Sequence, residues 1–377
     1  MNVNLKLILV AGARPNFMKI APLVRAIENH NTLAKDNELE IESIIVHTGQ
    51  HYDLTMSEKF FQELDLPEPK INLEVGSATH AVQTGEIMIR FEKACLDEKP
   101  DWVIVVGDVN STLAASLAAV KLRVPIAHIE AGIRMFDLSI PEEVNRLLSD
   151  LASDYLFTPC RDASDNLRNE GIPKERIYFV GNIMADTLLF SKQRAARRRV
   201  LSRLGLKKGG YALLTLHRPD NVDDRATLGQ LIQAAVDLSQ RIPVVFPAHP
   251  RTQKSLREFG LYDGVPVNNQ KFKLINPLGY LDFLNLEMNA RFVMTDSGGV
   301  QTETTILNVP CLTLYDTIAW GVTVEEGTNT MVGTEPARII QEASKILDGQ
   351  GKKGNRPELW DGKSAERIIE TLRTLSV

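Results

Sequence analysis

VPIAHIEAGIRMFDLSIPEEVNR, residues 124–146, is the stretch from which the fold of this chain is best read. A short apolar run ends at Glu130, a turn-rich loop follows, and Glu142, Glu143 and Arg146 then begin a helical stretch. An apolar strand that leads through a loop into a helix is one βα unit of a parallel sheet. A buried strand that directs its first acid toward such a loop is typical of a site for proton transfer at a charged substrate.

The βα pattern recurs in two sets along the 377 residues, a length that suits two domains. The first set of strand candidates covers residues 5–12, 41–49, 102–108, 124–132, 154–159 and 176–182. The second set covers residues 211–217, 243–249, 272–277, 291–299, 309–315 and 329–333. We therefore predict an α/β protein of two Rossmann-like, doubly wound domains. The first comprises residues 1–184 with the C-terminal helix at 361–377 packed back on it, and the second comprises residues 185–360.

Composition argues against several classes of protein. The formal net charge of −5 gives no electrostatic reason to expect a nucleic-acid or membrane partner. The basic run at 192–208 is interpreted as a solvated linker helix, with a polyanion site as the alternative. Three widely spaced cysteines suggest neither a zinc site nor a disulfide framework. No apolar run approaches transmembrane length and the N-terminus is too short for a signal peptide, so a cytoplasmic protein is expected.

Polar residues follow the predicted strands of both sets. Asp108, Glu130, His217, His249 and Ser297 each stand at the C-terminal end of one strand. In open parallel sheets this edge is where ligands bind. We therefore expect the two edges to face each other across one cleft.

Two strand–helix junctions are candidate anion sites. In TDSGGVQTET (295–304), Ser297 is expected to cap a helix, and Gly298 and Gly299 let an anion approach its N-terminus. In GARPNFMK (12–19), Arg14 and Lys19 suit a diphosphate or a carboxylate. The alternatives are an ordinary tight turn for the first segment and a solvated loop for the second.

Further candidates lie in shorter motifs. His217 and His249 are each followed within two residues by an arginine, which suits phosphate contact, whereas a lone histidine is more often a packed core residue. In HTGQH (47–51), Gln50 and His51 are a possible second-ligand contact or simply loop residues. No DxD motif and no dinucleotide fingerprint are present, so a metal-clamped or nicotinamide-dependent reaction is unsupported and a mechanism without a cofactor remains.

Together these motifs resemble the non-hydrolysing UDP-N-acetylglucosamine 2-epimerase family over nearly the whole chain. The motifs, in the order of the family, are GARPNFMKIAPL, HTGQHYD, GDVNST, HIEAGIR, PEEVNR, LHRPDN, FPAHPRT and TDSGGVQTET. The resemblance implies a fold similar to the GT-B glycosyltransferases, a site in the interdomain cleft, a homodimer, and no metal or nicotinamide. The implied reaction inverts C2 of a UDP-sugar through elimination of UDP and its re-addition.

The resemblance also implies roles for individual residues. The positions that match the catalytic acids of the family are Asp108, Glu130 and Glu142, and His217 matches a histidine that assists at the phosphate. The positions that match contacts to UDP and the sugar are Arg14, Lys19, Arg146, His249, Ser297, Gly298, Gly299 and Glu303. Glu143 matches no assigned function and is interpreted as favouring the start of the helix.

One loop departs from the pattern of the family. YDTIAWGVTVEEGTN (315–329) carries Tyr315 in place of an arginine, and Ala319, Trp320 and Gly321 in place of Glu-Arg-Pro. Trp320 is a candidate for stacking on a sugar or base. UDP-N-acetylglucosamine is therefore the first candidate substrate and UDP-N-acetylgalactosamine the second. A hydrolysing 2-epimerase and a binding protein without activity are the further alternatives.

Overall fold

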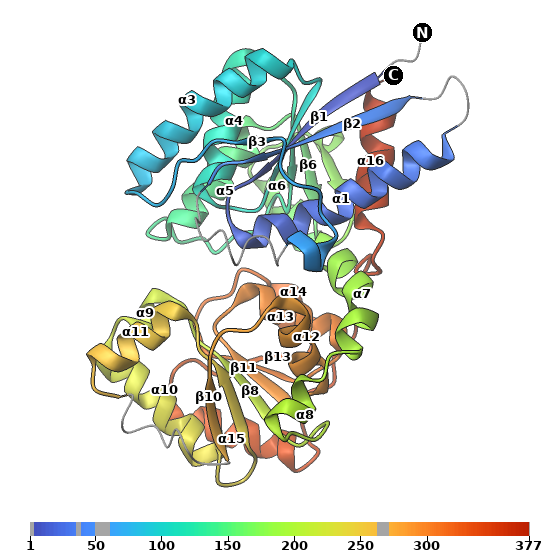
Figure 1. Cartoon of the computed structure of the whole chain (residues 1–377). Coiled ribbons are helices and arrows are strands. Elements are labelled where there is room, and N and C mark those ends of the chain that lie inside the picture. The colour runs from blue at the N-terminus through green and yellow to red at the C-terminus, as the bar shows by residue number, and fades with distance from the viewer. Residues whose placement is uncertain (1–3, 35–38, 50–60, 262–270, 377) are drawn as a thin grey trace. The chain divides into compact units, whose positions relative to one another are not determined.

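The structure, a computed structural model, describes residues 4–34, 39–49, 61–261 and 271–376. The chain forms two compact units (Figure 1). The first comprises Met1–Phe190 with Glu358–Val377, and the second comprises Ser191–Pro357. The boundary between the two units, after Phe190, therefore falls within helix α7 (Ile183–Ala196).

A seven-stranded parallel sheet forms the centre of the described first unit, in the order β3-β2-β1-β4-β5-β6-β7. Its strands are β1 (Asn4–Ala11), β2 (Glu40–His47), β3 (Ile71–Asn72), β4 (Trp102–Val106), β5 (Ile126–Ile129), β6 (Tyr155–Thr158) and β7 (Ile177–Phe179). Its other elements are α1 (Arg14–Leu33), α3 (His80–Glu98), α4 (Asn110–Leu122), α5 (Pro141–Ala152), α6 (Arg161–Asn169), the 3₁₀ turn η1 (Lys174–Arg176) and α16 (Ser364–Leu375).

Alternation along the strands explains how both faces of this sheet are buried. Ile8 and Val10 of β1 pack with Phe91 of α3 and Ala115 of α4 in one core. Helices α3, α4 and α5 lie side by side, and α16 packs against α1 (Figure 1).

A six-stranded parallel sheet forms the centre of the described second unit, in the order β10-β9-β8-β11-β12-β13. Its strands are β8 (Ala212–Thr215), β9 (Val244–Pro247), β10 (Phe272–Ile275), β11 (Phe292–Thr295), β12 (Cys311–Thr313) and β13 (Asn329–Met331). Its helices are α8 (Val200–Leu204), α9 (Pro219–Val222), α10 (Arg225–Leu238), α11 (Pro250–Glu258), α12 (Tyr280–Asn289), α13 (Gly298–Leu307), α14 (Gly321–Glu325) and α15 (Pro336–Leu347).

This second sheet is also buried on both faces. Leu214 and Met294 lie opposite each other in the register and join one core, whereas their neighbours Leu213 and Val293 join the other. The parallel Rossmann-like fold predicted for both halves is confirmed.

All twelve predicted strands form, but most end earlier than predicted. β5 ends at Ile129 because Glu130 and Gly132 take positive φ angles of 70° and 79°, which turn the chain out of the sheet. β11 ends at Thr295 because Ser297 already caps α13. The two-residue strand β3 was not predicted, since two residues show no periodicity.

The basic run differs from the single linker helix that was predicted. It contains the end of α7 and all of α8, and Arg198 and Arg203 form ion pairs with Asp282 of α12 at 2.7 and 3.0 Å. Part of the positive charge of this run is therefore paired with α12. No helix in the described parts of the chain has the length and apolar character needed to cross a membrane.

Each sheet reverses its strand order at one point, between β1 and β4 in the first and between β8 and β11 in the second. Loops leave such a point in opposite directions and open a crevice at the carboxyl ends of the strands. The predicted site residues are therefore expected at these two positions.

Candidate active site

The switch point of the first sheet joins Lys19 and Glu130. The Lys19 ammonium forms an ion pair with Glu130 Oε2, and their side chains are only 12% and 7% exposed. Asn16 fixes the loop beneath them, because its Oδ1 accepts from the Ala13 N–H at 2.8 Å and its Nδ2 donates to Val106 O at 3.0 Å. This bond ties the turn after β1 to the end of β4.

Asp108, which follows β4, is held by α5. Arg146 donates to Asp108 Oδ2 from Nε at 3.0 Å and from a terminal nitrogen at 2.5 Å. Burial raises the pKa of Asp108, but the charges of Arg146 and Lys19 outweigh it and hold that pKa below its ordinary value. Asp108 is therefore a carboxylate at neutral pH.

Glu142 and Glu143 have different surroundings although they are neighbours. Glu142 is exposed in the first turn of α5. Glu143 is 1% exposed, accepts from the N–H groups of Met135 and Phe136 at 2.8–3.0 Å, and pairs with Arg146 at 2.8 Å. The interpretation of Glu143 as a residue that only favours the helix start is wrong. Its signal in the sequence was the i, i+3 spacing to Arg146.

At the switch point of the second sheet, Asp296 organises the loop after β8. Its buried carboxylate accepts from the backbone N–H groups of His217 and Arg218 at about 3 Å, and from His217 Nδ1 at 2.8 Å. Burial raises the pKa of Asp296, but its hydrogen bond with His217 holds it below the ordinary value. Asp296 was not singled out from the sequence, although it stands at the end of a strand immediately before the glycine pair.

The glycine pair begins α13, as predicted for the TDSGG segment. Ser297 is its N-cap, with Oγ accepting from the Val300 N–H at 3.5 Å, and Gly298 and Gly299 form the first turn. The pyrrole edge of the Trp320 indole lies over Gly298, where an added Cβ would be 3.3–3.4 Å from it. The loop at 315–329, which departs from the family pattern, thus reaches the N-terminus of α13.

Tyr315 and Glu303 are occupied by protein contacts. Tyr315 donates its hydroxyl hydrogen to Asp220 at 2.8 Å, and the Arg218 guanidinium lies 4.0 Å from the centre of its ring. Glu303 lies buried on α13 beside Glu287 of α12. Burial, and then the charge of Glu303, raise the pKa of Glu287 well above its ordinary value.

The remaining predicted residues lie as follows. Arg14 is the first residue of α1 and is half-buried. His249 is the N-cap of α11, its Nδ1 accepts from the Arg251 N–H at 3.3 Å, and its ring centre is 6.2 Å from that of His217. Gln50 and His51 lie outside the described residues.

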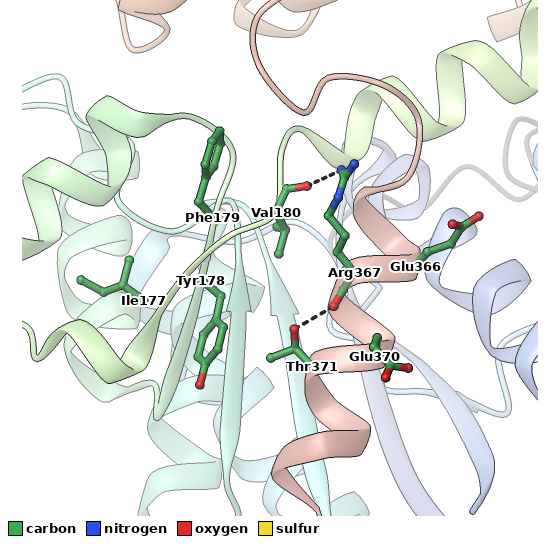
Figure 2. Close-up of a pocket in the computed structure, with 8 residues that line it drawn as sticks. All are labelled: Ile177, Tyr178, Phe179, Val180, Glu366, Arg367, Glu370 and Thr371. Atoms are coloured by element: carbon green, nitrogen blue, oxygen red, sulfur yellow. Dashed lines mark hydrogen bonds between the residues drawn. The ribbon is translucent and has the colours of Figure 1, made fainter.

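A pocket of about 610 Å³ lies elsewhere on the first unit (Figure 2). It is lined by Ile177, Tyr178, Phe179, Val180, Glu366, Arg367, Glu370 and Thr371. Arg367 donates to Val180 O at 3.0 Å across it. None of the predicted site residues lines this pocket. Within the described residues, no three His, Cys, Asp or Glu side chains are arranged to hold a metal ion.

A family model described as UDP-N-acetylglucosamine 2-epimerase matches residues 32–373 of the chain. The chain belongs to the UDP-N-acetylglucosamine 2-epimerase family.

Two curated relatives show what this family contains. The UDP-N-acetylglucosamine 2-epimerase of Methanocaldococcus jannaschii is 43% identical over 98% of this chain and 99% of its own length. The UDP-2,3-diacetamido-2,3-dideoxy-D-glucuronate 2-epimerase of Pseudomonas aeruginosa is 41% identical over 98% of this chain and 100% of its own length. Family membership makes this chain an epimerase of UDP-linked sugars, but its relatives act on different sugars.

A solved structure of the M. jannaschii UDP-N-acetylglucosamine 2-epimerase, in complex with UDP-N-acetylglucosamine and UDP, has a TM-score of 0.88. The two sequences are 42% identical in this comparison, which covers 98% of this chain and 100% of the other. The epimerase fold is therefore shared along the chain.

Proposed function

We propose that this epimerase inverts C2 of a UDP-2-acetamido sugar without a cofactor and converts UDP-N-acetylglucosamine to UDP-N-acetylmannosamine. A carboxylate accepts the C2 proton while the C1–O bond to UDP breaks, which leaves 2-acetamidoglucal and UDP. The C1–O bond then re-forms as C2 receives a proton on its opposite face. Atoms and charge balance without an oxidant or a reductant.

The observation that carries this proposal is the pair of carboxylates at the ends of neighbouring strands. Asp108 follows β4 and pairs with Arg146 of α5, and Glu130 follows β5 and pairs with Lys19 of α1. Inversion requires proton transfer on two faces of C2, so more than one acid–base group is needed. Asp108 and Glu130, each held by its own cation, could supply these two groups. We therefore propose that Lys19 positions Glu130 and that Arg146 positions Asp108, in addition to any contact with the substrate.

The second unit supports the UDP part of the proposal. The first N–H groups of a helix have no partner within the helix and attract anions, which suits Gly298 and Gly299 to a diphosphate. Because His217 Nδ1 donates to Asp296, Nε2 is the nitrogen that can meet a phosphate oxygen. We place His249, Ser297 and Glu303 of this unit in the same binding role, and we assign Arg14 of the first unit to a contact with the UDP-sugar.

Turnover in deuterated water tests the reaction. We expect the recovered nucleotide sugar to carry deuterium at C2, and Asp108→Asn and Glu130→Gln each to slow this exchange. An epimerised product without label would refute the elimination. Stoichiometric release of free UDP would instead indicate a hydrolysing enzyme.

The altered loop bears on the choice of sugar. Tyr315 is bonded to Asp220, and Trp320 presents an aromatic ring at the start of α13. An aromatic ring suits the apolar face of a sugar. NMR assays with UDP-N-acetylglucosamine, UDP-N-acetylgalactosamine and a UDP-2,3-diacetamido uronate would rank the substrates. We expect the first to have the highest kcat/KM.

We also propose a homodimer formed through helices α3 and α5. Val82, Ile89 and Leu96 recur at every seventh residue on α3 and are 56–66% exposed, and Leu151 of α5 is 69% exposed. Residues seven apart lie on one face of a helix, and adjacent α3, α4 and α5 extend this apolar surface.

The mass in solution tests the dimer. We expect a dimer for the natural chain and a monomer for Ile89→Glu, measured by light scattering. Leu33→Glu is the control, because Leu33 is 80% exposed at the end of α1 rather than on this surface. A monomeric natural chain, or an Ile89→Glu variant that stays dimeric, would refute this interface.

A further inference from the structure

A buried polar stripe on α5 connects the loops that carry the two proposed acids. Glu143, Arg146 and Asp150 are spaced three and four residues apart, so they lie on one face of the helix, and all three are buried. Arg146 binds Asp108, as described above. Asp150, one turn further along, reaches His128 in β5.

The ring of His128 lies between two hydrogen-bond acceptors. Its side chain is 1% exposed, Nδ1 is 2.6 Å from Asp150 Oδ1, and Nε2 is 2.8 Å from Gly107 O. A carbonyl oxygen can only accept a hydrogen bond, so Nε2 must donate.

Asp150 is an ionised acceptor. Its Oδ2 accepts from the Gly132 N–H at 3.0 Å and lies 2.7 Å from a terminal nitrogen of Arg134. Burial raises the pKa of Asp150, but His128 and Arg134 together hold it below its ordinary value. Since a carboxylate also only accepts, His128 Nδ1 must donate as well. Both ring nitrogens therefore face an acceptor oxygen, an arrangement in which only a ring with hydrogen on both nitrogens makes both hydrogen bonds.

The pair holds two turns that need support. Gly107 has a φ of 68° and directly precedes Asp108, and Gly132 has a φ of 79° two residues after Glu130. Glu130 itself takes a φ of 70°, which is uncommon for a residue with a side chain. Strained backbone of this kind persists only where its surroundings fix it.

We propose that the His128 imidazolium and Asp150 form a positioning pair that fixes the turns bearing Asp108 and Glu130 at the separation C2 inversion requires. The proposal rests on the proposed function of these two acids. Neither His128 nor Asp150 touches the substrate in this assignment. The pair acts through the Gly107 carbonyl on one side and the Gly132 N–H on the other.

The protonation of His128 is measurable without any substrate. In protein labelled with ¹⁵N at histidine, NMR at neutral pH should show both ring nitrogens of His128 protonated, and His128→Gln assigns the signals by their loss. A His128 ring with one unprotonated nitrogen would overturn the proposal. The protonation state is read in the natural chain, and the variant serves only to assign the signals.

Kinetics distinguish positioning from simple stabilisation. We expect Asp150→Asn and His128→Gln to lower kcat on the order of 100-fold with KM unchanged, since small misplacements of reacting groups cost rates of this size. The fraction of turnovers that release glycal and UDP should also rise, because the returning proton is misplaced. A variant that folds with an unchanged kcat and an unchanged release fraction would refute the positioning role.

Glu170→Gln is the matched control. Glu170 bonds Arg134 at 2.6 and 2.7 Å from the outer side of the same network and is 32% exposed, but it does not contact His128. Its removal should leave the release fraction unchanged. If the natural chain turns over no UDP-sugar, the proposed function fails, whereas the NMR result still decides the state of His128.

Discussion

Asp186 offers the most quantitative test of the forces that fix the C-terminal helix. Its carboxylate lies in α7 and accepts from the first backbone N–H groups of α16, at 2.8 Å from Ala365 and 3.2 Å from Ser364. Burial nevertheless dominates and raises the pKa of Asp186 from 3.8 to about 6. The folded protein therefore holds this proton more tightly than the unfolded chain does.

The size of the effect follows from linkage. A folded pKa above the unfolded one stabilises the fold fully below pH 3.8, and this contribution is lost as pH rises through about 6. A shift of about two units corresponds to about 3 kcal/mol. About 2 kcal/mol of this falls between roughly pH 4.5 and pH 7.5.

Asp186→Asn removes the titration and keeps one acceptor oxygen for the helix. Loss of the other oxygen costs about 1 kcal/mol at every pH. The stability of the variant relative to the natural chain should therefore improve by about 2 kcal/mol between roughly pH 4.5 and pH 7.5. A difference between the two proteins that stays constant over this range would refute the reasoning.

Urea unfolding followed by tryptophan fluorescence is the assay. The chain has three tryptophans, and the buried Trp102 and Trp360 lie in the same unit as Asp186. A Trp320→Phe background confines the signal to that unit. This matters because two units can unfold in separate transitions.

Three further substitutions test the site. Arg146→Gln removes the main charge that offsets the effect of burial on the pKa of Asp108, so that pKa should rise. The acid limb of the kcat/KM profile should then move to higher pH, and the rate should fall roughly 100-fold. An acid limb that stays at the same pH would contradict this prediction. Gly107→Ala should cost about 1 kcal/mol in urea unfolding and most of the activity, because φ is 68° and the new Cβ would lie 2.7 Å from Lys19 Nζ; full activity would argue against the geometry. The pKa of Glu287 is raised above 4.5, so its contribution to stability is lost as pH rises through the folded pKa. The melting temperature of Glu287→Gln should therefore exceed that of the natural chain by a margin that grows toward alkaline pH. A constant difference in melting temperature across pH would count against a buried, protonated carboxyl.

The order of the βα units and the residues at the ends of the strands could be predicted from the amino-acid sequence. Apolar runs and turn residues are local signals, so both sheets and the positions of Asp108, Glu130 and His217 followed from them. The substitutions in the loop around Trp320 could also be identified from the sequence, because comparison with a motif requires no coordinates.

Which of these groups meet and which are buried depends on how distant segments pack together. Lys19 and Glu130 are 111 residues apart, and no local pattern specifies that pair. Glu143 is buried whereas Glu142 is exposed, because adjacent residues of a helix point about 100° apart and packing sets the phase. For the same reason, His128 and Asp150 looked like ordinary strand and helix residues until the fold placed a carboxylate and a carbonyl on either side of one imidazole ring.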